Sequence, residues 1–171
     1  NEIRNVYKLR LEANNWLSPE TRGKAVDKLN SLRVFVGGPA ADDKPIIESM
    51  PDVISPKDGG DLLANVMHNG VLEKQQVHAL LGKDFNPDKW YAFDPQDVNA
   101  AYIPENNSIT IPAGILQPPF YDAKASRGAN LGGIGVVIGH EISHAFDPNG
   151  SKYDSEGRLK NWWNKKDYEA F

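Results

Sequence analysis

The chain has 171 residues, of which 40% are hydrophobic, and a formal net charge of −4 at pH 7. This length fits one domain or a large part of one, with enough apolar residues for a core. Charges of both signs are mixed and no basic block occurs, so no nucleic-acid partner is expected. The absence of cysteine excludes disulfides and cysteine-ligated zinc. No apolar run approaches the ~20 residues of a membrane span.

The N-terminal end of the chain is expected to be helical. Apolar residues at helical spacing predict an amphipathic helix over residues 3–17. A second helix is predicted to run to about Leu32, because Ser18 is a typical N-cap and Pro19 suits the first helical position. Residues 34–36 indicate a short strand or an exit turn.

Further along, the sequence alternates between loops and regular elements. Residues 37–59 are rich in Pro, Gly and Asp and predict a long irregular loop. Helical spacing returns over residues 62–81. A change of period then predicts a β-hairpin, with strands at 98–103 and 108–111 around the turn residues 104–107.

The remaining elements complete the expected fold. A second long loop is predicted over residues 112–130, then a helix that must stop before Pro148, and a last helix over residues 159–171. We therefore expect a mostly helical α+β structure with one small hairpin. Its helical part would be residues 1–90, and residues 91–171 would hold the hairpin and the helix before Pro148.

The helix predicted before Pro148 carries the pattern H-E-x-x-H, at His140, Glu141 and His144. Residues four apart lie on one helix face, so both imidazoles can reach one zinc ion at ~2.0–2.1 Å. Glu141 lies beside the metal, where it can take a proton from a zinc-bound water. The motif therefore predicts a zinc ion, a general base and hydrolysis of an amide.

A competing interpretation is a helix with two satisfied histidines and a surface glutamate. The flanking residues argue against it, since Ile134, Ile138 and Ile142 form an apolar stripe among valines and glycines. A helix that is apolar nearly all round is expected to be buried. Two histidines and a carboxylate would be costly there unless something compensates them, and a metal does so.

Two histidines supply only half of a tetrahedral site, and catalytic zinc usually has three protein ligands. The glutamates that follow the motif are Glu156 and Glu169, and either of them could complete the site. His68 and His78 lie upstream on polar helix faces and are expected to be solvated. The favoured interpretation is that the third ligand lies beyond residue 171.

Several motifs occur in the order and spacing of a known family. They are residues 98–102, 111–120 and 132–144 and the pair Trp162-Trp163, with a further match around Trp16. Together they resemble the neprilysin family of zinc metallopeptidases, which includes endothelin-converting enzyme and bacterial endopeptidase O. The resemblance covers nearly the whole chain and is strongest from residue 98 onward.

The resemblance implies roles for particular residues. His140 and His144 would be zinc ligands and Glu141 the general base, with one zinc ion in the parent enzyme. Asn99 and Ala100 match the family's Asn-Ala motif, which holds an extended peptide substrate. This agrees with the separately predicted strand, because peptide recognition by strand addition needs an open sheet edge.

Asp147 lies three residues past His144 and could accept a hydrogen bond from that ligand. The alternative is a role in the turn that ends the helix. Two positions depart from the family pattern without touching the metal: Ala145 replaces a frequent Gly, and Pro148 replaces a frequent acidic residue. The family's third ligand, in a Glu-x-x-x-Asp stretch, has no counterpart in this chain.

The whole chain, residues 1–171, is thus interpreted as a fragment of a zincin-like catalytic domain that cleaves oligopeptides and is inactive by itself. One alternative is a non-catalytic peptide-binding module, and another is a complete small zincin that uses Glu156 or Glu169. A fragment would expose apolar surface and could self-associate. The lack of cysteine resembles bacterial members, from the cytoplasm or the cell envelope, although no segment of the chain decides the compartment.

Overall fold

The computed structural model describes residues 2–40 and 53–171. They form two compact units, one that combines the chain up to residue 39 with residues 88–171, and one between them, residues 40–87. These boundaries differ from the expected division into 1–90 and 91–171. The reason is that a strand from the N-terminal region pairs with a strand from the C-terminal region.

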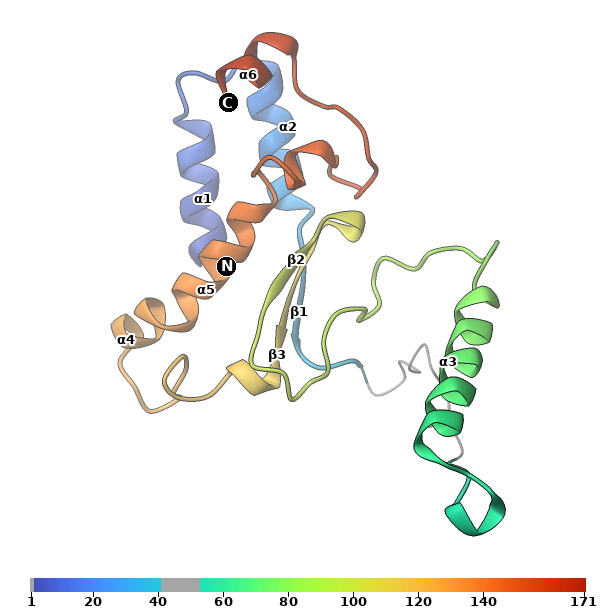
Figure 1. Ribbon diagram of the computed structural model, residues 1–171. Coiled ribbons are helices and arrows are strands. Elements are labelled where there is room, and N and C mark those ends of the chain that lie inside the picture. Colours follow the sequence, from blue (N-terminus) through green and yellow to red (C-terminus); the bar gives the residue numbers. More distant parts are fainter. Residues whose placement is uncertain (1, 41–52) are drawn as a thin grey trace. The chain divides into compact units, whose positions relative to one another are not determined.

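The first two helices lie together in the larger unit (Figure 1). Helix α1 (Glu2–Glu12) is shorter than the predicted 3–17. It ends early because the Asn14 side chain accepts the N–H groups of Trp16 and Leu17, at 3.1 and 2.9 Å. Helix α2 (Pro19–Asn30) begins as predicted, with the Ser18 side chain accepting the N–H of Thr21.

Three strands form one sheet in the order β1-β3-β2. Strand β1 (Arg33–Gly37) runs parallel to β3 (Ser108–Pro112), and β2 (Ala101–Ile103) runs antiparallel to it. The predicted hairpin is confirmed, but its first strand is shorter than 98–103. The residue that closes the turn, Asn107, has a φ of 46°. Asparagine tolerates this left-handed conformation better than most residues.

Helix α5 (Ile134–His144) packs against both α1 and the sheet (Figure 1). Its contacts belong to a buried cluster formed by residues of α2, the sheet and α5 and by residues that closely follow the two helices: Leu29, Leu32, Tyr102, Ile109, Ile142 and Ala145. The expectation that α5 is buried nearly all round is wrong. Val136 is 62% exposed and His140 is also exposed, so only one face of α5 enters the core.

The segments before and after α5 also differ in part from the prediction. The expected loop 112–130 includes the start of helix α4 (Arg127–Gly132), whose N-cap is Ser126. The expected helix 159–171 is reduced to α6 (Lys165–Ala170), capped by Asn164. Trp162 and Trp163 precede α6 and fill a second buried cluster against α2.

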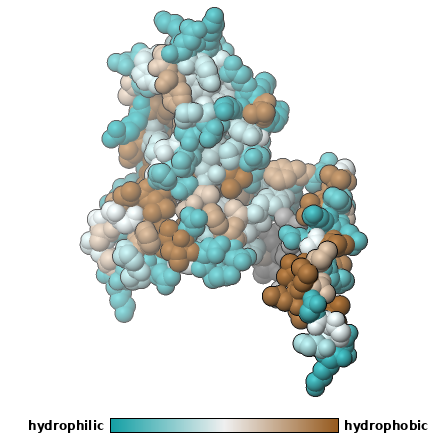
Figure 2. Space-filling model, viewed as in Figure 1, coloured by the Kyte–Doolittle hydropathy of each residue, from teal (hydrophilic) through white to brown (hydrophobic). Residues whose placement is uncertain are grey.

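The smaller unit contains helix α3 (Leu62–His78), which ends before the predicted residue 81. None of its residues is buried, and Figure 2 shows apolar side chains gathered on its visible face. The predicted loop 37–59 contains a 3₁₀ turn at Pro56–Asp58, while residues 41–52 lie outside the described residues. Among the described helices, none is both long and apolar enough to cross a membrane.

Candidate metal centre

The two histidines of the motif converge on one side of α5. Their Nε2 atoms lie 3.0 Å apart, and the two rings meet nearly at right angles, at 84°. A tetrahedral zinc ion at ~2.0–2.1 Å from each nitrogen would hold the pair ~3.3 Å apart. The donor pair is therefore close to the separation that zinc requires, and His140 is exposed enough for an ion to reach it.

Glu141 lies on the inner side of the same helix and is only 7% exposed. Its Oε2 atom accepts a 2.9 Å hydrogen bond from the backbone N–H of Tyr102 in β2. One carboxylate oxygen of Glu141 and one nitrogen of each histidine all lie within 4.8 Å of one another. The fold therefore holds a buried carboxylate beside two converging imidazoles.

Asp147 supports the second histidine. Its Oδ2 atom lies 2.7 Å from Nδ1 of His144. A carboxylate only accepts hydrogen bonds, so Nδ1 of His144 donates to Asp147, and Nε2, which faces His140, is the nitrogen left to bind a metal. The same side chain also accepts backbone N–H groups of Asn149 and Gly150, in the turn that follows α5.

The pKa of Asp147 reflects the same contacts. Burial by itself raises the pKa of this carboxyl group. Hydrogen bonds from His144 and from the backbone N–H groups of Gly150 and Asn149 outweigh burial, so the pKa falls below its ordinary value of 3.8. Oδ1 of Asp147 accepts both backbone bonds, each at 2.8 Å. The carboxylate is therefore charged near neutral pH and fixed at both oxygens.

The Asn-Ala pair lies immediately before β2, outside the strand that was expected to include it. The Asn99 side chain accepts the N–H of Ala100 at 2.9 Å and is exposed. β2 begins at the next residue and forms one edge of the sheet. The structure thus brings Asn99 and Ala100 to the start of the edge strand that contacts Glu141.

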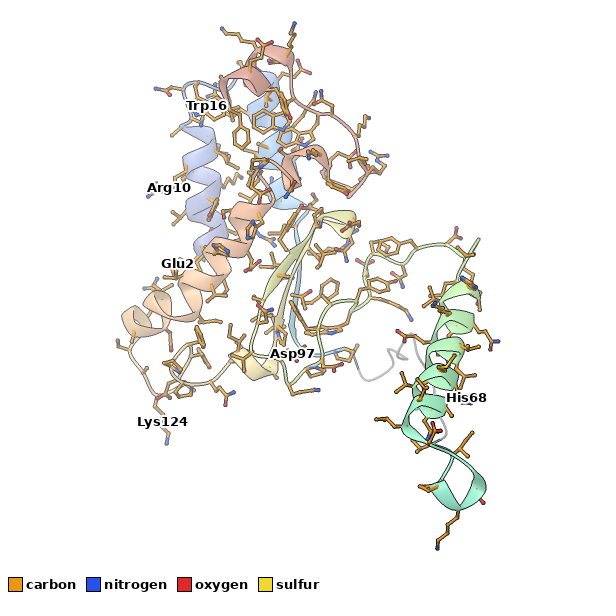
Figure 3. The ribbon with its side chains drawn as sticks, viewed as in Figure 1. Glu2, Arg10, Trp16, His68, Asp97 and Lys124 are labelled. Carbon is orange, nitrogen blue, oxygen red and sulfur yellow. The ribbon has the colours of Figure 1, made fainter. Side chains whose placement is uncertain are left out.

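The other candidate ligands lie elsewhere. Glu156 pairs with Arg158 at 2.8 Å, and Glu169 faces Lys165 at 3.8 Å. Within residues 2–40 and 53–171, the only group that brings together three or more residues of metal-binding type is the one on α5, and it includes neither glutamate. His68 and His78 are exposed on α3 of the other unit, where Figure 3 shows His68.

The sequence did not point to Tyr102 as part of the site. Its contribution is a backbone N–H, which every residue except proline carries, so its residue type gives no signal. Only the pairing of β2 with β3 and the packing of α5 on the sheet reveal it.

Comparison with known proteins agrees with this geometry. The model of Peptidase family M13 matches residues 99–171. A neutral endopeptidase of Lactococcus lactis is 40% identical over 168 residues, covering 97% of this chain and 25% of the relative. Human endothelin-converting enzyme 1 is 37% identical over 172 residues, covering 99% of this chain and 22% of the relative.

Solved structures give the same result. The crystal structure of PepO from Lactobacillus rhamnosis aligns with a TM-score of 0.83 and 42% identity, over 99% of this chain and 26% of PepO. A zinc metalloprotease of Mycobacterium tuberculosis in complex with an inhibitor aligns with a TM-score of 0.81 and 38% identity, over 98% of this chain and 24% of that one. The expected zincin-like fold, mostly helical with a small sheet, is confirmed. The chain spans about a quarter of the length of these relatives and belongs to peptidase family M13.

Proposed function

We propose that this chain carries the metal-binding half of a zinc-dependent endopeptidase site. The observation that supports this most directly is the group on α5, in which the two imidazole nitrogens lie 3.0 Å apart beside a buried carboxylate. The names of the relatives, which include neutral endopeptidase and zinc metalloprotease, support the same reaction class.

In this proposal each residue of the group has a separate task. His140 and His144 hold one zinc ion through Nε2. When bound, zinc lowers the pKa of a coordinated water toward 7 and polarises the substrate carbonyl. Glu141 accepts the proton of the attacking water, and its hydrogen bond from Tyr102 keeps the carboxylate in one orientation. Asp147 holds His144 in the tautomer that leaves Nε2 unprotonated.

Oligopeptides are the proposed substrates, and the edge strand β2 is their proposed binding place. An extended peptide can add to an open sheet edge through main-chain hydrogen bonds. Asn99 and Ala100 lie where such a peptide would begin to pair, and the exposed Asn99 amide offers side-chain donors to it. The contact between Tyr102 and Glu141 would then bring the peptide close to the general base.

The half-complete ligand set has a consequence for the isolated chain. With two protein ligands instead of three, it should bind zinc weakly and hydrolyse peptides poorly or not at all. Titration of the purified chain with zinc, against a chelating dye, tests this. We expect weak 1:1 binding that His144→Ala abolishes and that His68→Ala, on α3, leaves unchanged.

Other results would favour the alternatives. Tight zinc binding that is lost in Glu156→Ala or Glu169→Ala would indicate a complete small zincin. Binding of an extended peptide with no zinc binding at all would indicate a peptide-binding module. Hydrolysis of a peptide by the isolated chain, abolished by Glu141→Gln, would contradict the claim that the chain is inactive alone.

A further inference from the structure

We infer that Lys28 is a positioning residue, which holds the loop after α5 so that Asp147 keeps His144 in its metal-binding orientation. The inference rests on the proposed zinc site and adds to it a residue from α2, far away in the sequence. Nothing in the spacing of the metal motif points to this lysine.

The side chain of Lys28 is enclosed in an unusual way for a lysine. The residue is 1% exposed, and Nζ donates hydrogen bonds to the carbonyl oxygens of Gly150 and Tyr153, both at 2.6 Å. Nζ also lies 5.8 Å from the ring centroid of Tyr102 and 5.7 Å from that of Trp162, close enough for cation–π attraction. The ammonium group therefore holds both ends of the turn at residues 150–153 through hydrogen bonds.

The hydrogen bond from Lys28 to Gly150 is linked to His144 through Asp147. The N–H of Gly150 donates to Oδ1 of Asp147 at 2.8 Å, while Oδ2 of the same carboxylate lies 2.7 Å from Nδ1 of His144. Gly150 is also pressed against the end of α5, since a Cβ at that position would lie 1.9 Å from the carbonyl oxygen of His144. Movement of Gly150 would thus displace the carboxylate that orients His144.

The backbone of Lys28 is linked to Glu141 through two other residues. Its carbonyl oxygen accepts a 3.0 Å hydrogen bond from the Asn107 side chain, whose Oδ1 accepts the hydroxyl of Tyr102 at 3.1 Å. The N–H of Tyr102 in turn donates to Glu141. Lys28 is therefore linked to Asp147 through its side chain and Gly150, and to Tyr102 through its backbone and Asn107.

A buried lysine needs an explanation, because an apolar residue would fill this space without desolvating a charge. Within the described part of the chain, no carboxylate oxygen forms an ion pair with Nζ. Burial lowers the pKa of Lys28 to about 8, although the more distant charges of Asp154 and Asp147 act to raise it. The ammonium is thus retained at a cost, and its two carbonyl contacts identify what it does: it fixes the 150–153 turn.

The test compares Lys28→Met, which keeps a long stem and loses the ammonium, with Lys24→Met. Lys24 lies one turn earlier on α2, where it is exposed and paired with Glu20 at 2.7 Å. Long-range ¹H–¹⁵N spectra of the metal-free chain report the protonated nitrogen of His144 directly. We expect Nδ1–H to dominate in wild type and in Lys24→Met, and to give way to a mixture of both tautomers in Lys28→Met.

Zinc affinity provides a second readout, for which we expect Kd to rise roughly 10-fold or more in Lys28→Met, as for other supports of metal ligands. An unchanged tautomer in a folded Lys28→Met protein would overturn the inference, as would a wild-type His144 without Nδ1–H. If the tautomer depends on Lys28 while wild type binds no zinc, the positioning role stands and the proposed function fails.

Two further measurements cover a variant that does not fold. Lys28→Arg keeps donors for both carbonyls and should preserve the wild-type tautomer, which a requirement for lysine packing alone would not predict. In wild type at low temperature, the Nζ protons of Lys28 should exchange slowly with water because they are buried and hydrogen-bonded. Fast exchange of these protons would contradict the two hydrogen bonds from Nζ to the 150–153 turn.

Discussion

The backbone N–H of Tyr102 donates a 2.9 Å hydrogen bond to Oε2 of Glu141, and this bond joins the edge strand β2 to the motif helix α5. It gives the proposed general base a fixed position before any substrate arrives. It also means that Glu141 has a structural role that can be separated from its chemical one, because glutamine can still accept this hydrogen bond and leucine cannot.

The first prediction uses that difference. Glu141→Gln should leave the free energy of unfolding within ~0.5 kcal/mol of wild type, whereas Glu141→Leu should lose ~1–3 kcal/mol because the buried N–H of Tyr102 loses its partner. Urea unfolding of both variants measures this. In a chain with the complete site, Glu141→Gln should also lower kcat by ~10²–10⁴. Equal stabilities of the two variants would show that the hydrogen bond contributes nothing.

The second prediction concerns Asp147→Asn. The N–H groups of Asn149 and Gly150 should hold the amide oxygen of the new side chain in the place of Oδ1. Its NH₂ group would then face His144 and donate to Nδ1, so Nε2 would carry the proton and lose its lone pair. Zinc affinity should fall roughly 10- to 100-fold, as measured by chelator competition.

Asp122→Asn is the matched control for this change. Asp122 also accepts a backbone N–H two residues ahead, that of Lys124, but in an exposed loop outside the metal group. Its substitution should leave zinc affinity unchanged. A similar loss in both variants would assign the effect to net charge and not to the orientation of His144.

The third prediction compares two glycines near the motif. Gly150→Ala should be strongly destabilising, by more than ~2 kcal/mol, because the new Cβ would lie 1.9 Å from the carbonyl oxygen of His144. Gly139→Ala lies in the interior of α5 with nothing within 4 Å of the new Cβ. It should be neutral or stabilise the protein by ~0.5–1 kcal/mol, because alanine is the better helix former. Thermal unfolding of both variants measures the difference in stability. A loss of stability in Gly139→Ala would contradict the prediction that a methyl group at this position meets no other atoms.

Local signals in the sequence predicted much of this fold. The cap at Ser18 and the turn before Ser108 placed α2 and the hairpin correctly, since each depends on a few neighbouring residues. The early end of α1 was not predicted, because the side chain of Asn14 competes with the helix only once the following residues turn toward it. The long final helix was wrong because Trp162 and Trp163 pack into the core in non-helical backbone.

The candidate site shows the same contrast. His140, Glu141 and His144 follow from their spacing, and Asp147 from its distance to His144 along the chain. Lys28 and Tyr102 reach the site through contacts between residues 39 or more positions apart, in which a lysine side chain meets carbonyls and a backbone N–H meets a carboxylate. Such partners are defined by tertiary packing, and no pattern within a single segment reveals them.

The fourth prediction concerns self-association of the isolated chain. An apolar groove of ≈ 320 Å³ lies between α1, the sheet and α5, and Val34 and Val36 of β1 line it while remaining 50% and 56% exposed. An exposed edge strand with apolar side chains favours association. Light scattering at high concentration should show species larger than a monomer, and a Val34→Thr, Val36→Thr double variant should weaken the association. Monomeric wild type under these conditions would contradict the prediction.

The fifth prediction is a loss of stability in acid through Asp167. This carboxylate in α6 accepts the N–H and the hydroxyl of Ser18 and the amide of Asn164. Burial alone raises its pKa, but these hydrogen bonds outweigh burial and lower the pKa below the ordinary value of 3.8. A carboxyl group whose pKa is lower in the folded than in the unfolded state stabilises the fold above the unfolded value. That contribution disappears as pH falls through the folded value.

Asp167→Asn should therefore be less stable than wild type at about pH 6, and the difference should shrink in acid as pH falls through the lowered pKa of the folded-state carboxyl. Urea unfolding at a series of pH values measures the difference. Asp27→Asn, which removes an exposed carboxylate from α2, supplies the baseline for the loss of one charge. A difference between Asp167→Asn and wild type that stays constant over this range would mean that Asp167 contributes through packing and not through its charge.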